Sequence, residues 1–266
     1  MRGFENKTDS EIVLNAYDSI QKSQAFFLFQ EDQYKSSGDM GDLIKIAAAC
    51  DEPVLLLGES GSGKSFYAEK IHRMSSRSNY EMQKYNAASF APAIIESQLF
   101  GTEPGAFTDS VKTKGIFEQA DKSTLFLDEI SELPLELQAK LLCVLEDKRV
   151  RRLGSNGSHN FDARFIFASN KDLKSLVSQG LFREDLYYRI SVIQIKLPPL
   201  RQRMNDLDSI AREVAGEKGK LLDDSALGKL KTYDWPGNIR ELKNVVSKAC
   251  IFSSGKLVTD KDIVFE

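Results

Sequence analysis

Val-Leu-Leu-Leu-Gly-Glu-Ser-Gly-Ser-Gly-Lys-Ser, residues 54–65, is the stretch that decides the fold of this 266-residue chain. Its first residues form a continuous apolar run, which is typical of a strand buried on both faces of a parallel sheet. The glycines at positions 58, 61 and 63 then allow the backbone to turn sharply and to approach a ligand closely. Lys64 and Ser65 follow and open a predicted helix over residues 66 to about 74.

The spacing of these residues matches G-x-x-x-x-G-K-S, the pattern of a phosphate-binding loop or P-loop. In such a loop the backbone N–H groups and the positive end of the helix dipole hold phosphate oxygens. Lys64 would reach the β- and γ-phosphates, and the Ser65 hydroxyl would bind Mg²⁺. A glycine-rich turn without a ligand is the alternative, but strand, glycines, Lys-Ser and helix all agree with the motif. The predicted nucleotide contacts are Gly58, Glu59, Ser60, Gly61, Ser62, Gly63, Lys64 and Ser65.

The composition is that of an ordinary globular protein, with 41% hydrophobic and 28% charged residues. A net charge of −3 implies no global attraction to nucleic acid or to a membrane. No apolar run is long enough to span a membrane, and no signal peptide is visible. The unclustered cysteines at positions 50, 143 and 250 fit a reducing cytoplasm, and we expect them in the core. His72 and His159 are expected at the surface, without a histidine-rich metal site.

A second chemical landmark is the segment Ser-Thr-Leu-Phe-Leu-Asp-Glu at residues 123–129. It predicts a buried strand that ends in two carboxylates. Beside a P-loop, Asp128 would hold Mg²⁺ through water and Glu129 would polarise the attacking water as a general base. The alternative is an acidic pair at the surface. Ligands of open parallel sheets bind at the carboxyl ends of the strands, so Asn86 and Asn170, which end two further predicted strands, are expected near the same site.

Strands alternate with helices up to Pro199, and helices follow alone. This order predicts a three-layer α/β domain with a mostly parallel sheet, followed by a small all-helical lid domain. We expect an N-terminal segment over residues 1–35, the α/β domain over 36–201 and the lid over 202–266. In the first segment, a helix over residues 9–25 and an apolar run at 25–29 are predicted. The run is either a strand or a packing patch.

Several motifs together resemble the AAA+ ATPase domain of the bacterial enhancer-binding proteins, the sigma-54-dependent transcription activators. The likeness covers roughly residues 40–265, and the combination of motifs is highly specific. The motifs are Gly-Glu-Ser-Gly-Ser-Gly-Lys at 58–64, Glu-Ser-Gln-Leu-Phe-Gly at 96–101, Gly-Ala-Phe-Thr at 105–108, Thr-Leu-Phe-Leu-Asp-Glu-Ile at 124–130, Phe-Arg-Glu-Asp-Leu-Tyr-Tyr-Arg at 182–189, Leu-Pro-Pro-Leu-Arg at 197–201 and Trp-Pro-Gly-Asn-Ile-Arg-Glu-Leu at 235–242.

The resemblance implies a homo-oligomeric ring, usually a hexamer, with ATP and Mg²⁺ bound between subunits. By position, Asn86 matches the asparagine that restrains the catalytic glutamate Glu129, and Asn170 matches sensor I. Arg183 and Arg189 match the arginine-finger region, which acts on the neighbour's γ-phosphate; a surface salt bridge with Glu184 and Asp185 is the alternative. A further match implied by the resemblance is Arg240, at the position of sensor II.

The family's surface loop normally reads Gly-Ala-Phe-Thr-Gly-Ala and touches sigma-54. Phe107 and Thr108, the contact residues, are retained here, but Asp109 replaces a flexible glycine. The predicted partner loop is Gly105, Ala106, Phe107, Thr108, Asp109 and Ser110.

The expected activity is therefore ATP hydrolysis that remodels sigma-54 RNA polymerase. Two alternatives stay open: a nucleotide-gated regulatory or scaffold module, and an AAA+ remodeller of a different protein or of DNA. The net negative charge disfavours the DNA version, although the basic cluster at residues 148–152 could contact DNA locally; a solvated loop is the alternative for that cluster. No receiver domain precedes the chain and no helix-turn-helix follows residue 266, so we expect either an excised module or a regulator without DNA contacts of its own.

Overall fold

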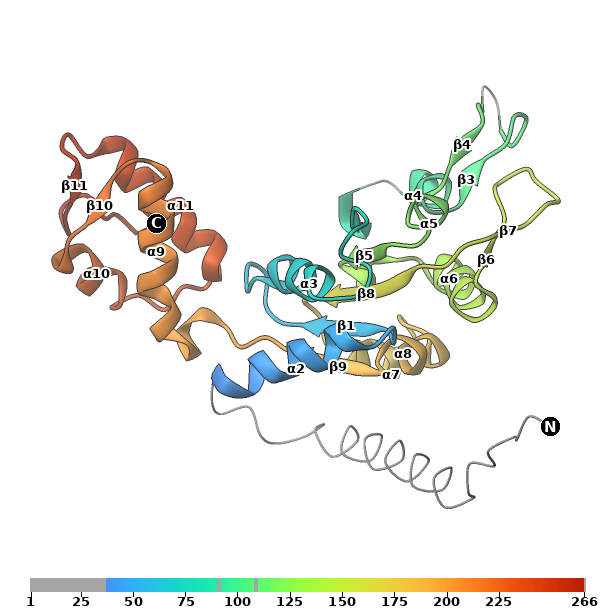
Figure 1. Cartoon of the computed structure of the whole chain (residues 1–266), viewed down its shortest axis with the longest axis horizontal. Helices are drawn as coiled ribbons and strands as arrows, with labels where there is room; N and C mark the ends of the chain where they lie inside the picture. Colours follow the sequence, from blue (N-terminus) through green and yellow to red (C-terminus); the bar gives the residue numbers. More distant parts are fainter. Residues whose placement is uncertain (1–36, 90–91, 108–109, 266) are drawn as a thin grey trace, which may run out of the picture. The chain divides into compact units, whose positions relative to one another are not determined.

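The computed structural model describes residues 37–89, 92–107 and 110–265 (Figure 1). The helix predicted over residues 9–25 and the apolar run at 25–29 lie outside these residues. The chain divides into two compact units, residues 1–43 and 44–266. Of the first unit the structure describes residues 37–43, which form the N-terminal part of helix α2 (Ser37–Ala49).

A five-stranded parallel sheet organises the second unit, with the strand order β2-β5-β8-β1-β9. The strand β1, predicted from its apolar run, lies between two neighbours, and its residue Leu55 pairs with Phe167 and Gln194. Because both faces are covered, β8 is buried along its whole length. The strands are β1 (Val54–Leu57), β2 (Gln83–Asn86), β5 (Thr124–Asp128), β8 (Arg164–Ser169) and β9 (Ile193–Lys196).

Helices connect and cover these strands, which confirms the α/β fold class (Figure 1). Helix α3 packs against β1 and β5, directly after the P-loop. Many of the buried apolar side chains of the sheet and its helices form one hydrophobic cluster. The connecting helices are α3 (Lys64–Arg73), η1 (Ala87–Ser89), α4 (Pro92–Phe100), α5 (Ile116–Gln119), η2 (Ile130–Glu132), α6 (Leu135–Asp147), α7 (Leu173–Ser178) and α8 (Glu184–Ile190).

Two short antiparallel hairpins extend from this domain and lie side by side (Figure 1). One is formed by β3 (Gly101–Thr102) and β4 (Thr113–Lys114), and the other by β6 (Arg149–Val150) and β7 (His159–Asn160). A β-bridge between Thr102 and Leu153 joins them. The glycine- and serine-rich segment 151–158 is therefore closed by paired strands on both sides.

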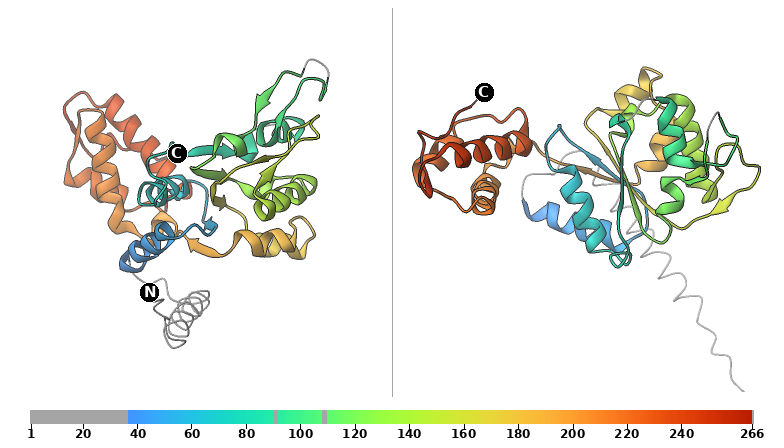
Figure 2. Two further views of the ribbon diagram at one scale, coloured as in Figure 1. Left: turned by 45° about the vertical axis from the view of Figure 1, so that its right-hand side comes forward. Right: turned by 90° about the horizontal axis from the view of Figure 1, so that it is seen from above.

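The C-terminal region has a hydrophobic core of its own, centred on the fully buried Trp235. The indole N–H of Trp235 donates to the Leu230 carbonyl at 3.0 Å, which satisfies its one polar group. Its helices gather in one group, with α9 against α11 (Figure 2). They are η3 (Leu200–Gln202), η4 (Met204–Asp206), α9 (Leu207–Glu217), α10 (Asp224–Leu230) and α11 (Asn238–Phe252). Residues 202–265 are called the lid below.

Some details differ from the sequence-based expectations. The lid is not purely helical, since β10 (Leu221–Leu222) and β11 (Leu257–Val258) pair in parallel. His72, expected at the surface, is buried, and its Nδ1 lies 2.9 Å from the Thr124 hydroxyl. Cys143, expected in the core, is exposed. Within the described part of the chain, no helix has the length and apolar character needed to cross a membrane.

Candidate functional site

The P-loop, residues 58–65, runs from the end of β1 into the first residues of α3. Gly61 and Gly63 have φ angles of 75° and 97°, which are left-handed conformations that suit glycine. The buried Lys64 ammonium donates to the carbonyls of Gly58 at 2.9 Å and Glu59 at 3.2 Å. Burial lowers the pKa of Lys64, whereas Glu129 and Asp128 act to raise it. The lysine and both carboxylates therefore share one electrostatic site.

Of the two predicted catalytic carboxylates, Asp128 is the last residue of β5 and Glu129 is the first residue after it. The backbone N–H of Glu129 donates to Asp128 Oδ1 at 3.0 Å, which orients that carboxylate. Glu129 itself has a φ of 53°, an uncommon conformation for this residue type and a feature often found at functional sites. Burial raises the pKa of Glu129, and Lys64 opposes this shift. A half-buried carboxylate with a raised pKa is suited to accept a proton.

Two asparagines lie at the ends of β2 and β8, the strands on either side of β5. The Asn170 N–H donates to Glu129 Oε2 at 3.4 Å, so the residue after β8 directly contacts the predicted base. Asn86 pairs in register with Asp128, but its side-chain oxygen accepts from the Ala88 N–H at 2.8 Å. The sheet thus brings both asparagines to the same edge as the carboxylates, and only Asn170 is hydrogen-bonded to one of them.

The predicted arginine-finger residues lie apart from this group, on and before α8. Both are exposed. Arg183 forms a two-pronged pair with Asp185, at 3.0 Å and 2.7 Å. Arg189 Nη2 donates to the Leu145 carbonyl at 3.4 Å. In the single chain, Arg183 therefore has the surface ion pair that the sequence offered as an alternative.

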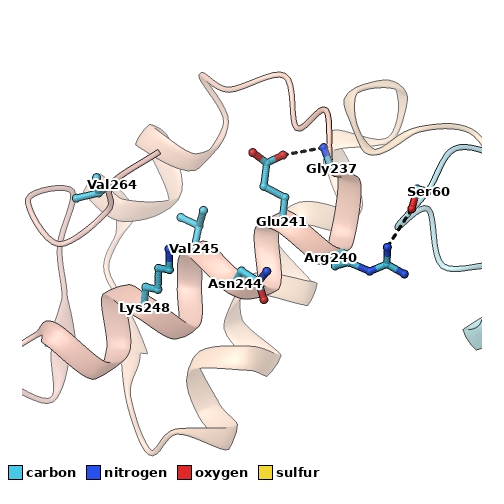
Figure 3. Close-up of a pocket in the computed structure, with 8 residues that line it drawn as sticks. All are labelled: Ser60, Gly237, Arg240, Glu241, Asn244, Val245, Lys248 and Val264. Carbon is cyan, nitrogen blue, oxygen red and sulfur yellow. Dashed lines mark hydrogen bonds between the residues drawn. The ribbon is translucent and has the colours of Figure 1, made fainter. Parts of the chain in front are cut away.

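The lid contacts the P-loop through several residues. Arg240 Nη1 donates to the Ser60 hydroxyl at 2.9 Å (Figure 3). A cavity of about 270 Å³ adjoins this contact. Figure 3 shows that one side of α11, with Arg240, Asn244 and Lys248, runs along it. The remaining lining residues are Ser60, Gly237, Glu241, Val245 and Val264.

Sequence reasoning missed several further contacts of the P-loop. Arg201 forms a bidentate ion pair with Glu59. Asn238 donates to Glu59 Oε2 at 3.0 Å and to the Ser60 carbonyl at 3.1 Å. Arg203 donates to the Ser62 carbonyl. The motifs at 197–201 and 235–242 contain two of these residues, but only the folded chain shows that they meet the P-loop.

The surface loop, residues 105–110, connects the strands of the β3–β4 hairpin. Phe107 is 55% exposed there. The Ser110 hydroxyl accepts from the Phe107 N–H at 3.3 Å and donates to the Glu103 carbonyl at 3.2 Å, which closes the base of the loop. Thr108 and Asp109 lie outside the described residues. Buried Arg152 of the neighbouring hairpin binds Glu103 and Glu118, with three contacts of 2.6 Å.

The site residues fit a nucleotide with Mg²⁺. Ser65 and Asp128 offer oxygen donors, which Mg²⁺ prefers. The left-handed glycines of the P-loop suit a concave set of N–H groups that binds anions. Ser62 Oγ is buried and has no hydrogen-bond partner among the described residues. In the same part of the chain there is no cluster of three or more His, Cys, Asp or Glu side chains that would hold a metal by itself.

A P-loop after β1, an acidic pair after β5 and a helical lid on the P-loop define a P-loop ATPase of the AAA+ class. Comparison with known families agrees. The model described as the sigma-54 interaction domain matches residues 31–196, and the AAA+ ATPase lid domain matches residues 201–266. The chain therefore belongs to the family of sigma-54-dependent activators and is an ATPase of that family.

Curated relatives support the assignment. The formate hydrogenlyase transcriptional activator FhlA of Escherichia coli is 45% identical over 223 residues, which are 81% of this chain and 32% of the relative. The Nif-specific regulatory protein of Azotobacter vinelandii is 44% identical over 230 residues, 84% of this chain and 44% of the relative. The chain thus spans less than half the length of either protein.

A solved structure of similar fold is that of NtrX from Brucella abortus in complex with ATP. It superposes with a TM-score of 0.77 at 28% identity, covering 98% of this chain and 64% of that one. A second NtrX structure, in complex with ADP, matches equally well.

Proposed function

We propose that this chain hydrolyses Mg-ATP at the P-loop and, as a ring, remodels sigma-54 RNA polymerase to activate transcription. The observation that carries the proposal is the shared site of Lys64, Asp128 and Glu129, in which the two carboxylates influence the pKa of the lysine. The exposed Phe107 adds a surface for a protein partner. Because RNA polymerase is the proposed target, the proposed location of the protein is the cytoplasm. The two separate hydrophobic cores support a division into two domains, which we propose at residues 36–201 and 202–266.

In this proposal the P-loop N–H groups and Lys64 hold the phosphates, and Arg240 adds a cation from the lid. Ser65 and Asp128 would hold Mg²⁺, which neutralises phosphate charge when bound. Glu129 takes the proton of the attacking water, and Asn170 orients Glu129 through the hydrogen bond described above. Asn86 lies beside Asp128 and is proposed to restrain Glu129 until a partner binds.

Ring formation is proposed because the predicted arginine-finger residues lie apart from the P-loop and the catalytic carboxylates of their own chain. Arg183 and Arg189 are exposed, and within the described residues they bind Asp185 and the Leu145 carbonyl, not the catalytic carboxylates. A neighbouring subunit would supply them, at the cost of opening the half-exposed Arg183–Asp185 pair. That cost is small, because exposed ion pairs are screened by solvent and contribute little to stability. A hexamer is the proposed ring.

A second candidate is a nucleotide-gated module, or an AAA+ remodeller of another target, that does not bind sigma-54. The observation that favours it is the Ser110 hydroxyl, which restrains the Phe107 loop where the family has alanine. Asp109 in place of the family's glycine points the same way.

Size-exclusion chromatography with light scattering tests the proposal. The protein is run with Mg²⁺ and ADP–aluminium fluoride, with and without purified sigma-54, and ATPase activity is measured on the same sample. The proposal predicts a ring that hydrolyses ATP and co-migrates with sigma-54. A ring that turns over ATP but leaves sigma-54 behind would support the second candidate. A monomer without turnover at any concentration would contradict both the ring and the hydrolysis.

A further inference from the structure

Three consecutive carbonyl groups of the P-loop accept hydrogen bonds from the lid. The Ser60 carbonyl accepts from Asn238 Nδ2 at 3.1 Å, and the Gly61 carbonyl accepts from the Ile239 N–H at 3.0 Å. The Ser62 carbonyl accepts from the Arg203 guanidinium. All three donors belong to the lid, which begins well over a hundred residues later in the chain.

These bonds have a consequence for the opposite side of the loop. In a trans peptide the carbonyl of one residue and the N–H of the next point in opposite directions. Carbonyls of Ser60 and Ser62 that face the lid therefore turn the N–H groups of Gly61 and Gly63 away from it. Those N–H groups belong to the set that would receive phosphate oxygens. The Ser62 N–H instead closes the loop by donating to the Glu59 carbonyl at 3.2 Å.

The contact is too close to tolerate a side chain at its centre. A Cβ atom added to Gly61 would lie 2.4 Å from the Gly237 carbonyl oxygen. The P-loop and the turn before α11 are thus packed backbone against backbone, and lid movement would move the loop with it.

Asn238 holds this junction together. It is fully buried and has a left-handed φ of 56°, which asparagine tolerates better than most residues. Its Oδ1 accepts from the Leu200 N–H at 2.8 Å, while its Nδ2 donates to Glu59 and Ser60. The carboxamide is a suitable group here, since it combines an acceptor for the linker with donors for the P-loop.

We propose that Asn238 is a positioning residue, through which the docked lid sets the phosphate-binding geometry of residues 59–63. The inference rests on the proposed binding of ATP phosphates at the P-loop. Docking of the lid and affinity for the triphosphate are then thermodynamically coupled. A change that moves the lid alters nucleotide affinity, and nucleotide binding in turn alters how the lid docks.

The test compares Asn238→Asp with the matched control Asn205→Asp, which makes the same change at an exposed lid position. The buried change keeps the acceptor for Leu200 but replaces the donor by an oxygen that faces Glu59 and Ser60. Affinity for a fluorescent ATP analogue with Mg²⁺, KM, kcat and thermal unfolding are measured. We expect the analogue's Kd and the KM to rise at least about tenfold in Asn238→Asp and to stay unchanged in the control.

The kinetic constants separate positioning from simple destabilisation. A variant that only unfolds in part has fewer active sites, so its apparent kcat falls and its KM stays the same. A lower kcat with an unchanged KM would therefore overturn the inference. If Asn238→Asp does not fold, Asn238→Gly, which accepts the same φ and has no side chain, replaces it with the same expected rise in KM.

Rescue provides a second criterion. Adding Glu59→Gln to Asn238→Asp supplies an amide donor to the new carboxylate, so ATP affinity should recover in part. If Asn238 had a merely structural role, the second substitution would lower ATP affinity further, because Arg201 would lose its ionic partner Glu59. A further loss, or a Kd of Asn238→Asp within about twofold of the wild type, would overturn the inference. Absence of ATP binding by the wild type itself would instead refute the proposed function.

Discussion

Arg201 and Glu59 form a bidentate ion pair across 142 residues of sequence, with N–O distances of 2.9 Å and 2.6 Å. Hydrogen bonds from Arg201, and then from Asn238, lower the pKa of the Glu59 carboxyl to about 2. The pair joins the P-loop to the linker before the lid. It therefore makes the stability of this junction depend on pH.

The first prediction concerns that pH dependence. The folded-state pKa of Glu59 is about 2, below its ordinary value of 4.5. The ionised carboxylate thus stabilises the fold above about pH 4.5, and the contribution is lost as the pH falls toward 2. Both side chains are exposed to solvent, so the contribution to the free energy of unfolding is small. Urea unfolding of the wild type and of Glu59→Gln should give a difference in free energy that shrinks between pH 5 and 2.5. If the difference in unfolding free energy stays constant over this range, the ion pair is not its cause.

The second prediction separates nucleotide binding from hydrolysis. Glu129→Gln keeps the size of the side chain but removes the base, so ATP should still bind and kcat should fall by about 10²–10⁴-fold. Because burial raises the pKa of Glu129, wild-type turnover should also begin to decline on acidification at a higher pH than an ordinary glutamate would give. Retention of ATP on a filter measures binding by the variant. Single-turnover kinetics measure its rate of hydrolysis and the pH dependence of the wild type. Normal turnover in the variant would remove Glu129 from its proposed role.

The third prediction concerns the surface loop. Phe107→Ala should leave ATP hydrolysis within about twofold of the wild type, because the residue is 55% exposed and lies in the β3–β4 hairpin, outside the P-loop. Open-complex formation at a sigma-54 promoter should be lost. Val111→Ala is a matched control, since it removes another apolar side chain that is 67% exposed in the same hairpin. Transcription activation that survives Phe107→Ala would refute the assignment of the loop.

The parts of the fold that local pattern determines were predictable from sequence. The apolar run at residues 54–57 becomes β1 with the predicted limits. The rule that ligands bind at the carboxyl ends of parallel strands placed Asn170 near Glu129, and the structure joins them by a hydrogen bond. Helix α7 was missed because it is short, although Asp172 caps it by accepting from the Lys174 N–H.

The remaining features depend on contacts between distant segments. His72 is a polar residue in a helix, and only the packing of α3 against β5 brings its ring to Thr124. Asn238 is one residue of a turn motif, and its contacts to Glu59 and Ser60 arise from the docking of the lid. No local periodicity encodes such a contact. Cys143 shows the converse, since an apolar sequence neighbourhood did not place it in the core.

The last prediction tests whether Arg183 acts on a neighbouring subunit. Lys64→Ala should lose ATP affinity, and Arg183→Ala should bind ATP but hydrolyse it about 10³-fold more slowly or worse. In mixed rings, the Arg183→Ala subunits keep an intact P-loop and the Lys64→Ala subunits keep an intact arginine. Where the two kinds adjoin in the correct order, a complete site forms, so ATPase activity should reappear on mixing. Mixing Lys64→Ala with the double variant Lys64→Ala/Arg183→Ala should restore nothing, because no P-loop is intact. If light scattering shows that rings form but the first mixture stays inactive, the proposed role is refuted. Arg183 then forms the surface ion pair with Asp185 and does not act on the phosphate of the neighbouring subunit.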